Sequence, residues 1–111
     1  MTVKELAKHL DLELEAGENG LEREINGVYI CDLLSFAMGK APPDSAWITV
    51  MNNMNVIAVA SLADVACVVI SHGLRPDSQA IEKANEMDIP ILISKLPSFE
   101  TGKSIFETIN E

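Results

Sequence analysis

The stretch that decides the fold runs from residue 46 to residue 93 and reads AWITVMNNMNVIAVASLADVACVVISHGLRPDSQAIEKANEMDIPILI. It holds three apolar runs, at 46–50, 66–70 and 89–93, and each is followed by a polar loop and a segment with helical spacing. The middle run does not alternate with polar residues, which is typical of a strand buried on both faces. We therefore predict three consecutive β-α units with parallel strands and right-handed crossovers.

Helices are predicted after each of these strands. Residues 56–63 are rich in small apolar side chains, and 77–87 begin at an aspartate suited to capping. Ser98 is predicted to cap a last helix. This helix is expected to turn four side chains inward, namely Phe99, Ile105, Phe106 and Ile109.

Residues 1–20 predict a helix, a strand and a turn ahead of this run. Thr2 and Glu5 have the spacing of a capping box, in which each side chain bonds the backbone amide of the other. Apolar residues then recur at helical spacing up to Leu10, and apolar and acidic residues alternate over 10–16, as in a half-buried strand. A turn is expected from Gly17 to Gly20.

The segment between residues 26 and 39 predicts a second strand and a short helix. Residues 28–31 form an apolar run, and the Asn26-Gly27 dipeptide before it matches a hairpin turn. Asp32 is suited to cap a helix over 33–38, and Gly39 is suited to end it.

Length and composition agree with one globular domain of the α/β class. The chain has 111 residues, of which 48% are hydrophobic and 23% are charged, a globular composition. A chain of this length buries roughly two thirds of its unfolded surface. We expect a single three-layer-like domain over residues 1–111, with a mainly parallel sheet built from consecutive β-α units plus an N-terminal helix and strand.

The charge balance excludes two classes of partner. Eight Lys and Arg residues face 17 Asp and Glu residues, for a net charge of -9. We therefore expect neither nucleic acid nor a membrane as a partner, since phosphate backbones and anionic lipids both attract basic surfaces. Six carboxylates of the first quarter of the chain are expected to form a solvated face, namely Asp11, Glu13, Glu15, Glu18, Glu22 and Glu24.

Targeting signals and cysteine usage point to the cytoplasm. The first residues lack the apolar core of a signal peptide. The longest apolar stretch, 56–70, is interrupted by polar residues and is shorter than the ~20 residues of a membrane span. Cys31 and Cys67 lie far apart in strand-like stretches, so we expect buried, reduced thiols.

Polar side chains gather where the three predicted strands end. The carboxyl ends of parallel strands meet at one edge of the sheet, where open α/β sheets bind ligands. The candidate ligand-binding residues are Asn52, Asn53, Asn55, Ser71, His72, Gly73, Arg75, Asp77, Ser94 and Lys95. Helix N-termini and the side chains of His72, Arg75 and Lys95 suit this edge to a small anion. The same residue types also cap helices and form turns, so both interpretations stay open.

No catalytic constellation is evident. His9 is expected on a solvated helix face and His72 in a loop, so neither is paired with a nucleophile, and they lack metal-ligand spacing. Gly102-Lys103-Ser104 matches the end of a phosphate-binding loop, but Pro97 stands where the first glycine of that loop is required. We expect no enzyme activity, no metal and no cofactor.

The residues also resemble known families along nearly the whole chain. Leu14-Glu15-Ala16-Gly17-Glu18 and the segment from Arg23 to Val28 are similar to the amino-terminal domain of HPr kinase/phosphorylase. Ala46-Trp47-Ile48-Thr49, Val68-Val69-Ile70-Ser71 and Ile89-Pro90-Ile91-Leu92 resemble DRTGG domains, small α/β modules found alone or fused to CBS pairs. Where the motif that names these domains would follow the first of the three strands, this chain has Asn52-Asn53-Met54-Asn55-Val56.

The resemblance implies a stand-alone, non-catalytic regulatory module. Such a module would form a homodimer and bind a small anionic, nucleotide-like effector, an adenine nucleotide for example, or a signalling or metabolic partner protein. Two alternatives are a phosphotransfer enzyme related to HPr kinase and a purely structural dimerisation domain. The first alternative requires a complete nucleotide loop, which the sequence lacks.

Overall fold

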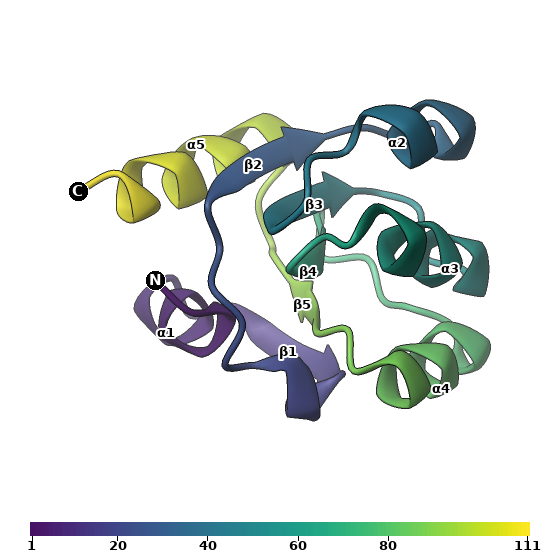
Figure 1. Cartoon of the computed structure of the whole chain (residues 1–111). Coiled ribbons are helices and arrows are strands. Elements are labelled where there is room, and N and C mark those ends of the chain that lie inside the picture. The colour runs from purple at the N-terminus through teal and green to yellow at the C-terminus, as the bar shows by residue number, and fades with distance from the viewer.

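Five strands form one sheet in the computed structural model, which describes residues 1–111. The strands are β1 (Glu13–Ala16), β2 (Gly27–Ile30), β3 (Ser45–Thr49), β4 (Cys67–Ile70) and β5 (Ile91–Ile93). Their spatial order is β1-β5-β4-β3-β2. Strands β2 to β5 are parallel, and β1 pairs with β5 in the antiparallel sense (Figure 1). The predicted α/β fold with a mainly parallel sheet is confirmed.

Helices cover both faces of this sheet, which gives the three layers that were expected (Figure 1). One face carries α1 (Val3–His9) and α5 (Ser98–Ile109), and the other carries α2 (Leu34–Lys40), α3 (Met54–Ala63) and α4 (Ser78–Met87). The capping box at Thr2 and Glu5 is present at the start of α1. No helix combines the length and the apolar character that crossing a membrane requires.

The three central strands are buried on both faces, as their unbroken apolar runs indicate. All residues of β3, β4 and β5 are buried. Trp47 packs toward α2, α3 and α4, and its indole nitrogen donates a hydrogen bond to the Cys31 carbonyl at 3.0 Å. Its neighbour Ile48 packs toward α1 and α5. Successive residues of a strand thus build two separate cores.

The predicted hairpin turn at Asn26-Gly27 is wrong. A hairpin would pair β2 with β1, but β1 lies at the opposite edge of the sheet. A short helical turn, η1 (Glu18–Gly20), follows β1, and the chain then crosses to β2 beside β3. The Asn26 amide donates to the Asp44 carbonyl, which aligns β2 parallel to β3. The position of β2 beside β3 therefore overrides the preference of Asn26-Gly27 for a hairpin turn.

The start and end of α2 also differ from the prediction. Asp32 does not cap this helix, which begins at Leu34 with no side-chain cap. Its carboxylate instead accepts hydrogen bonds from Thr49 Oγ1 at 2.8 Å and the Val50 amide at 2.9 Å. Asp32 thereby links the ends of β2 and β3. Gly39 lies within the helix, which continues to Lys40.

The last helix is rotated relative to the prediction. Ser98 is its first residue rather than its cap, and no side chain caps it. Ile105 is fully buried as expected, but Phe99 and Phe106 are 68% and 59% exposed. The buried face includes Gly102, where an added Cβ would lie 2.8 Å from Ile30 Cδ1. Small residues on this face let α5 approach the sheet closely and leave the two phenylalanines outside.

The two cysteines differ in environment, although neither forms a disulfide. Cys67 is fully buried in β4, and burial raises the pKa of its thiol to about 12. Cys31 is only half-buried. The prediction of a buried thiol is therefore confirmed for Cys67 and wrong for Cys31.

Gly17 is the position where the backbone tolerates a side chain least. Its φ is +77°, and an added Cβ would lie 2.0 Å from the Ile89 carbonyl oxygen. We expect Gly17→Ala to lower the free energy of unfolding by more than about 2 kcal/mol, because strain and overlap combine. Gly39→Ala is the control, since no atom lies within 4 Å of its added Cβ and alanine favours the helix by roughly 0.5–1 kcal/mol. Urea denaturation measures both, and equal losses would contradict this assignment.

Candidate functional site

The carboxyl ends of the parallel strands lie side by side, which brings their loops to one edge. Thr49 pairs with Ile70, and Ile70 pairs with Ile93, so β3, β4 and β5 end at one level. The antiparallel strand β1 begins at the same level, because Glu13 pairs with Ile93. Residues 10–13 therefore join the three loops at this edge.

Asparagine and aspartate side chains at the edge organise the loops. Asn53 accepts a hydrogen bond from the Asn55 amide at 3.0 Å and caps α3. Asp77 caps α4 by accepting from the Ala80 amide at 2.8 Å. Asn52 Nδ2 donates to the carbonyl of residue 75 at 2.7 Å. The side chains of Asn52, Asn53 and Asp77 thus make the capping and turn contacts that were the plainer interpretation.

Serine and threonine hydroxyls join the sheet to α5. Ser94 Oγ lies 2.7 Å from Thr101 Oγ1, and both residues are buried. The Leu96 amide also donates to Ser94 Oγ, at 3.2 Å. Ser71 Oγ, at the end of β4, lies 2.7 Å from Ser98 Oγ. These bonds position the first turns of α5 over the ends of β4 and β5.

His72 and Gly73 connect the loops through their backbones. Both adopt left-handed conformations, with φ of +60° and +68°. The His72 amide donates to the Leu96 carbonyl and the Gly73 amide to the Ser94 carbonyl, each at 2.8 Å. The two loops are therefore held together while both residues stay exposed.

Arg75 is neutralised by two carboxylates of β1. It forms ion pairs with Glu13 and Glu15. The hydrogen bond from Arg75 lowers the pKa of Glu13, and the same contact raises the pKa of Arg75. Glu13 and Glu15 are thus not simply solvated, as was expected, but hold the loop after β4 against the edge of the sheet.

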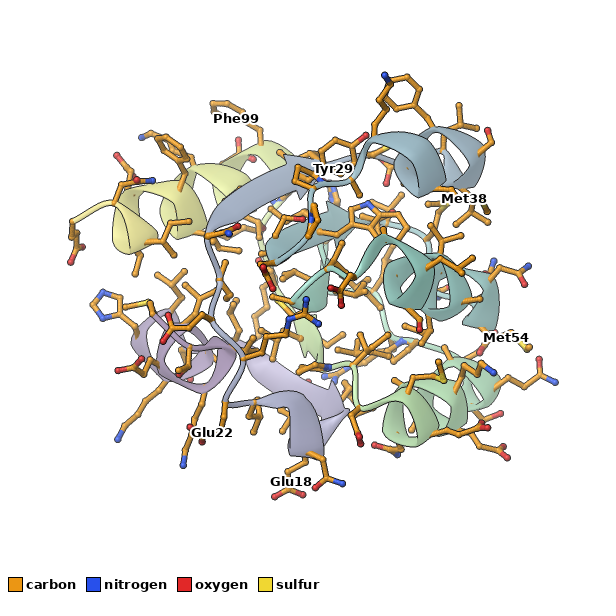
Figure 2. All side chains as sticks on the ribbon, in the orientation of Figure 1. Glu18, Glu22, Tyr29, Met38, Met54 and Phe99 are labelled. Atoms are coloured by element: carbon orange, nitrogen blue, oxygen red, sulfur yellow. The ribbon has the colours of Figure 1, made fainter.

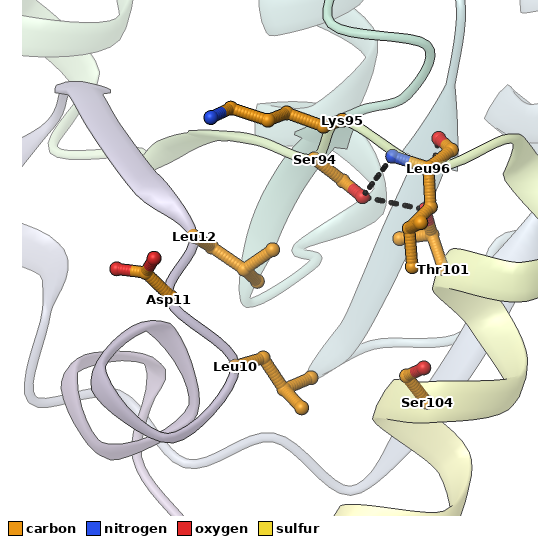
Figure 3. Close-up of a pocket in the computed structure, with 8 residues that line it drawn as sticks. All are labelled: Leu10, Asp11, Leu12, Ser94, Lys95, Leu96, Thr101 and Ser104. Atoms are coloured by element: carbon orange, nitrogen blue, oxygen red, sulfur yellow. Dashed lines mark hydrogen bonds between the residues drawn. The ribbon is translucent and has the colours of Figure 1, made fainter.

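A cavity of about 230 Å³ opens between the start of β1, the loop after β5 and α5 (Figure 3). Eight residues line it, namely Leu10, Asp11, Leu12, Ser94, Lys95, Leu96, Thr101 and Ser104. A second hollow of about 320 Å³ shares Asp11 and Lys95 with it and extends to Gly73 and Arg75. We call the two hollows together the Lys95 cleft.

The Lys95 cleft offers three kinds of contact. Lys95 is exposed and forms no ion pair, so its ammonium is available to an anionic group. The hydroxyl of Ser104 and the carboxylate of Asp11 offer hydrogen bonds, and leucines supply apolar walls. The Thr101 hydroxyl is buried and already bonded to Ser94 and to the Leu96 carbonyl. No group of three or more His, Cys, Asp or Glu side chains is arranged to hold a metal ion.

The sequence model of the DRTGG domain matches residues 5–108. The chain belongs to the DRTGG domain family. No curated protein matches it. Among solved structures, the DRTGG domain superposes with a TM-score of 0.76 and 16% identity on the CBS and DRTGG domains of the regulatory region of Clostridium perfringens pyrophosphatase, complexed with its activator diadenosine tetraphosphate. The match covers 94% of this chain and 45% of that one, so this DRTGG domain spans less than half of the matched structure.

Eight of the twelve residues that line the cleft in this DRTGG domain were missed by sequence reasoning. Leu10, Asp11 and Leu12 come from the connection before β1, and Thr101 and Ser104 come from α5. The strand predicted over 10–16 is wrong at its start, because Leu10 ends α1, Asp11 has a φ of +54° and β1 begins at Glu13. The alternation of apolar and acidic residues also does not show which strand lies beside β1. Only the pairing of β1 with β5 brings Asp11 to Lys95.

The ion pairs of Arg75 predict a pH-dependent stability. Glu13 has a lowered pKa when folded, so its stabilising contact is present above its unfolded pKa and is lost as pH falls through the folded one. We expect Arg75→Gln to return the pKa of Glu13 toward its ordinary value and to destabilise the fold at pH 7 but not in acid, where the carboxyl is protonated in both states. Carboxyl NMR titration and denaturation across pH measure this.

Lys40→Gln, at an exposed lysine that forms no ion pair, is the control for Arg75→Gln. An unchanged Glu13 titration in Arg75→Gln, matching the control, would contradict the coupling.

Proposed function

We propose that this DRTGG domain is a non-catalytic regulatory module whose Lys95 cleft takes a small anionic effector of the nucleotide class. The observation that carries the proposal is the unpaired ammonium of Lys95 at a hollow lined by hydroxyls and leucines. A lysine in such a place acts as a point charge for a phosphate. The family match and the likeness to a regulatory region support the regulatory role.

Local charge limits the size of the effector. Lys95 is the one cation of the cleft that is not paired, because Arg75 is held by carboxylates. Asp11 and Glu13 also line the cleft and would repel a polyphosphate. Ligand sites typically measure roughly 300–1,000 Å³, so the hollow of about 320 Å³ lies at the lower end of this range and the one of about 230 Å³ lies below it. A mononucleotide with few phosphates therefore fits this chemistry better than a dinucleotide tetraphosphate.

The other candidate residues have supporting roles in this proposal. Ser94 holds α5 beside the cleft through Thr101, and Gly73 lines the second hollow. The remaining candidates shape the loops and helix starts, namely Asn52, Asn53, Asn55, Ser71, His72 and Asp77. Homodimer formation and a cytoplasmic location, both expected above, stay predictions.

The phosphotransfer alternative fits the structure less well. Gly102-Lys103-Ser104 lies inside α5, where backbone amides are used by helical hydrogen bonds rather than left free to wrap a phosphate. Lys103 and Ser104 also line different hollows. We expect no phosphate transfer when the protein is incubated with ATP, magnesium and HPr. Robust labelling of HPr would overturn the non-catalytic assignment.

Ligand-dependent thermal stability tests the effector site. We expect at least one nucleoside monophosphate or diphosphate to raise the melting temperature, because a ligand at 100 times its Kd stabilises the native state by about 2.7 kcal/mol. Lys95→Gln should abolish this shift. The control Lys83→Gln removes a cation on α4, away from the cleft, and should keep it.

Each other outcome of this screen has a defined meaning. A shift that survives in Lys95→Gln would place the site elsewhere. No shift with any nucleotide would overturn effector binding and favour the purely structural alternative.

A further inference from the structure

The two edges of the sheet are built differently. The β1 edge carries Glu13 and Glu15 and has a register irregularity between Leu14 and Ala16. Charges and irregularities of this kind prevent a strand from pairing with another chain. The β2 edge reads Gly-Val-Tyr-Ile, has no charge, and keeps a regular register with β3 over all four residues. Alternate backbone groups of β2 therefore face outward and are free to pair.

An apolar groove of about 500 Å³ runs beside this open edge, between β2 and α5. Phe99 and Phe106, both more than half exposed, and Ile30, 44% exposed, line it. Phe99 projects outward from α5 on the side of the molecule where β2 lies, and Glu18 and Glu22 lie on the opposite side (Figure 2). Contiguous apolar exposure of this kind marks an interaction site.

We propose that β2 pairs antiparallel with β2 of a second copy of this chain, so that the two sheets become one and the two α5 helices pack against each other. The proposal extends the homodimer expected for this DRTGG domain by assigning its surface. It is independent of the Lys95 cleft, which shares the helix α5 with the groove but no lining residue.

The spacing of the helices supports a second copy as the occupant. A two-fold axis perpendicular to the sheet keeps both α5 helices on the same face. If α5, which packs over both β2 and β3, has its axis midway between them, this axis lies about half a strand spacing inside β2. With strands ~4.8 Å apart, the two helix axes are then roughly 10 Å apart, the normal distance for packed helices.

The residues of α5 are also self-complementary about that axis. Phe99 and Phe106 are seven residues apart and so lie on one stripe of the helix. In an antiparallel pair centred between residues 102 and 103, Phe99 of one copy meets Phe106 of the other. Lys103, which lines the same groove, then lies next to the two-fold axis. A two-fold interface requires this kind of match between a surface and itself.

Charge distribution points to the same edge. Each copy has a net charge of -9, which opposes self-association in general. The groove is lined by no carboxylate, and its one charged residue is Lys103. An interface at this groove therefore brings no carboxylates of the two copies together.

Sedimentation velocity tests the dimer and its surface. We expect the wild-type chain to form a dimer at micromolar concentration. Ile30→Lys and Phe106→Asp should each raise the dissociation constant at least tenfold, and both side chains are exposed enough for the fold to tolerate the change. Leu62→Asp, at a 73% exposed leucine of α3, is the matched control and should leave the dimer intact. A monomeric wild type, or a dimer unaffected by either edge variant, would overturn the proposal.

Cross-linking tests the antiparallel geometry. In a Cys31→Ser background, Lys103→Cys should form a disulfide-linked dimer on mild oxidation, because residue 103 lies next to the two-fold axis. Lys40→Cys should not. Failure of Lys103→Cys to cross-link in a dimeric protein would overturn this arrangement. The nucleotide screen on monomeric Phe106→Asp reports separately on the Lys95 cleft, so the two proposals can fail independently.

Discussion

The antiparallel pairing of β1 with β5 is the contact on which the rest of the molecule depends. It closes the β5 edge and carries residues 10–13 to the carboxyl ends of the parallel strands. Without it, Lys95 would have no opposite wall, and Arg75 would have no carboxylates to hold the loop after β4. The same pairing leaves β2 as the only edge without a protecting charge.

The placement of β1 also sorts charge across the molecule. The acidic residues of β1 and of the turn after it lie at the β1 end, as Glu18 does in Figure 2. A chain with a net charge of -9 thus keeps one apolar edge and one cation in its cleft that forms no ion pair, Lys95. Since exposed charges act over a Debye length of roughly 8 Å at physiological salt, these local environments matter more for binding than the net charge does.

The parts that the sequence predicts correctly are those that local patterns determine. Unbroken apolar runs predict strands buried on both faces, and β3, β4 and β5 are such strands. The errors concern choices that only the tertiary fold makes. Asn26-Gly27 has hairpin chemistry, but the strand that would complete the hairpin pairs with β5 instead.

Side-chain roles at the edge show the same limit. Asp32 is a residue type that often caps helices, but its carboxylate instead accepts hydrogen bonds from Thr49 Oγ1 and the Val50 amide at the end of β3. Phe99 and Phe106 have the spacing of residues that face a core. The face of α5 that packs on the sheet instead carries the smaller residues Thr101 and Gly102, which allow a close approach. The candidate loops could be predicted because parallel strands end together, whereas Asp11 and Ser104 could not, since no local pattern reports which strand lies beside β5.

One helix joins the two proposed surfaces. Ser104 and Thr101 face the Lys95 cleft, while Phe99 and Phe106 line the groove beside β2. The hydroxyl pairs Ser94–Thr101 and Ser71–Ser98 attach the start of this helix to the strand ends. A ligand that contacts Ser104 therefore acts on the same helix that carries the dimer contacts. Any change that binding makes in dimer affinity must be matched by an equal change that dimerisation makes in binding.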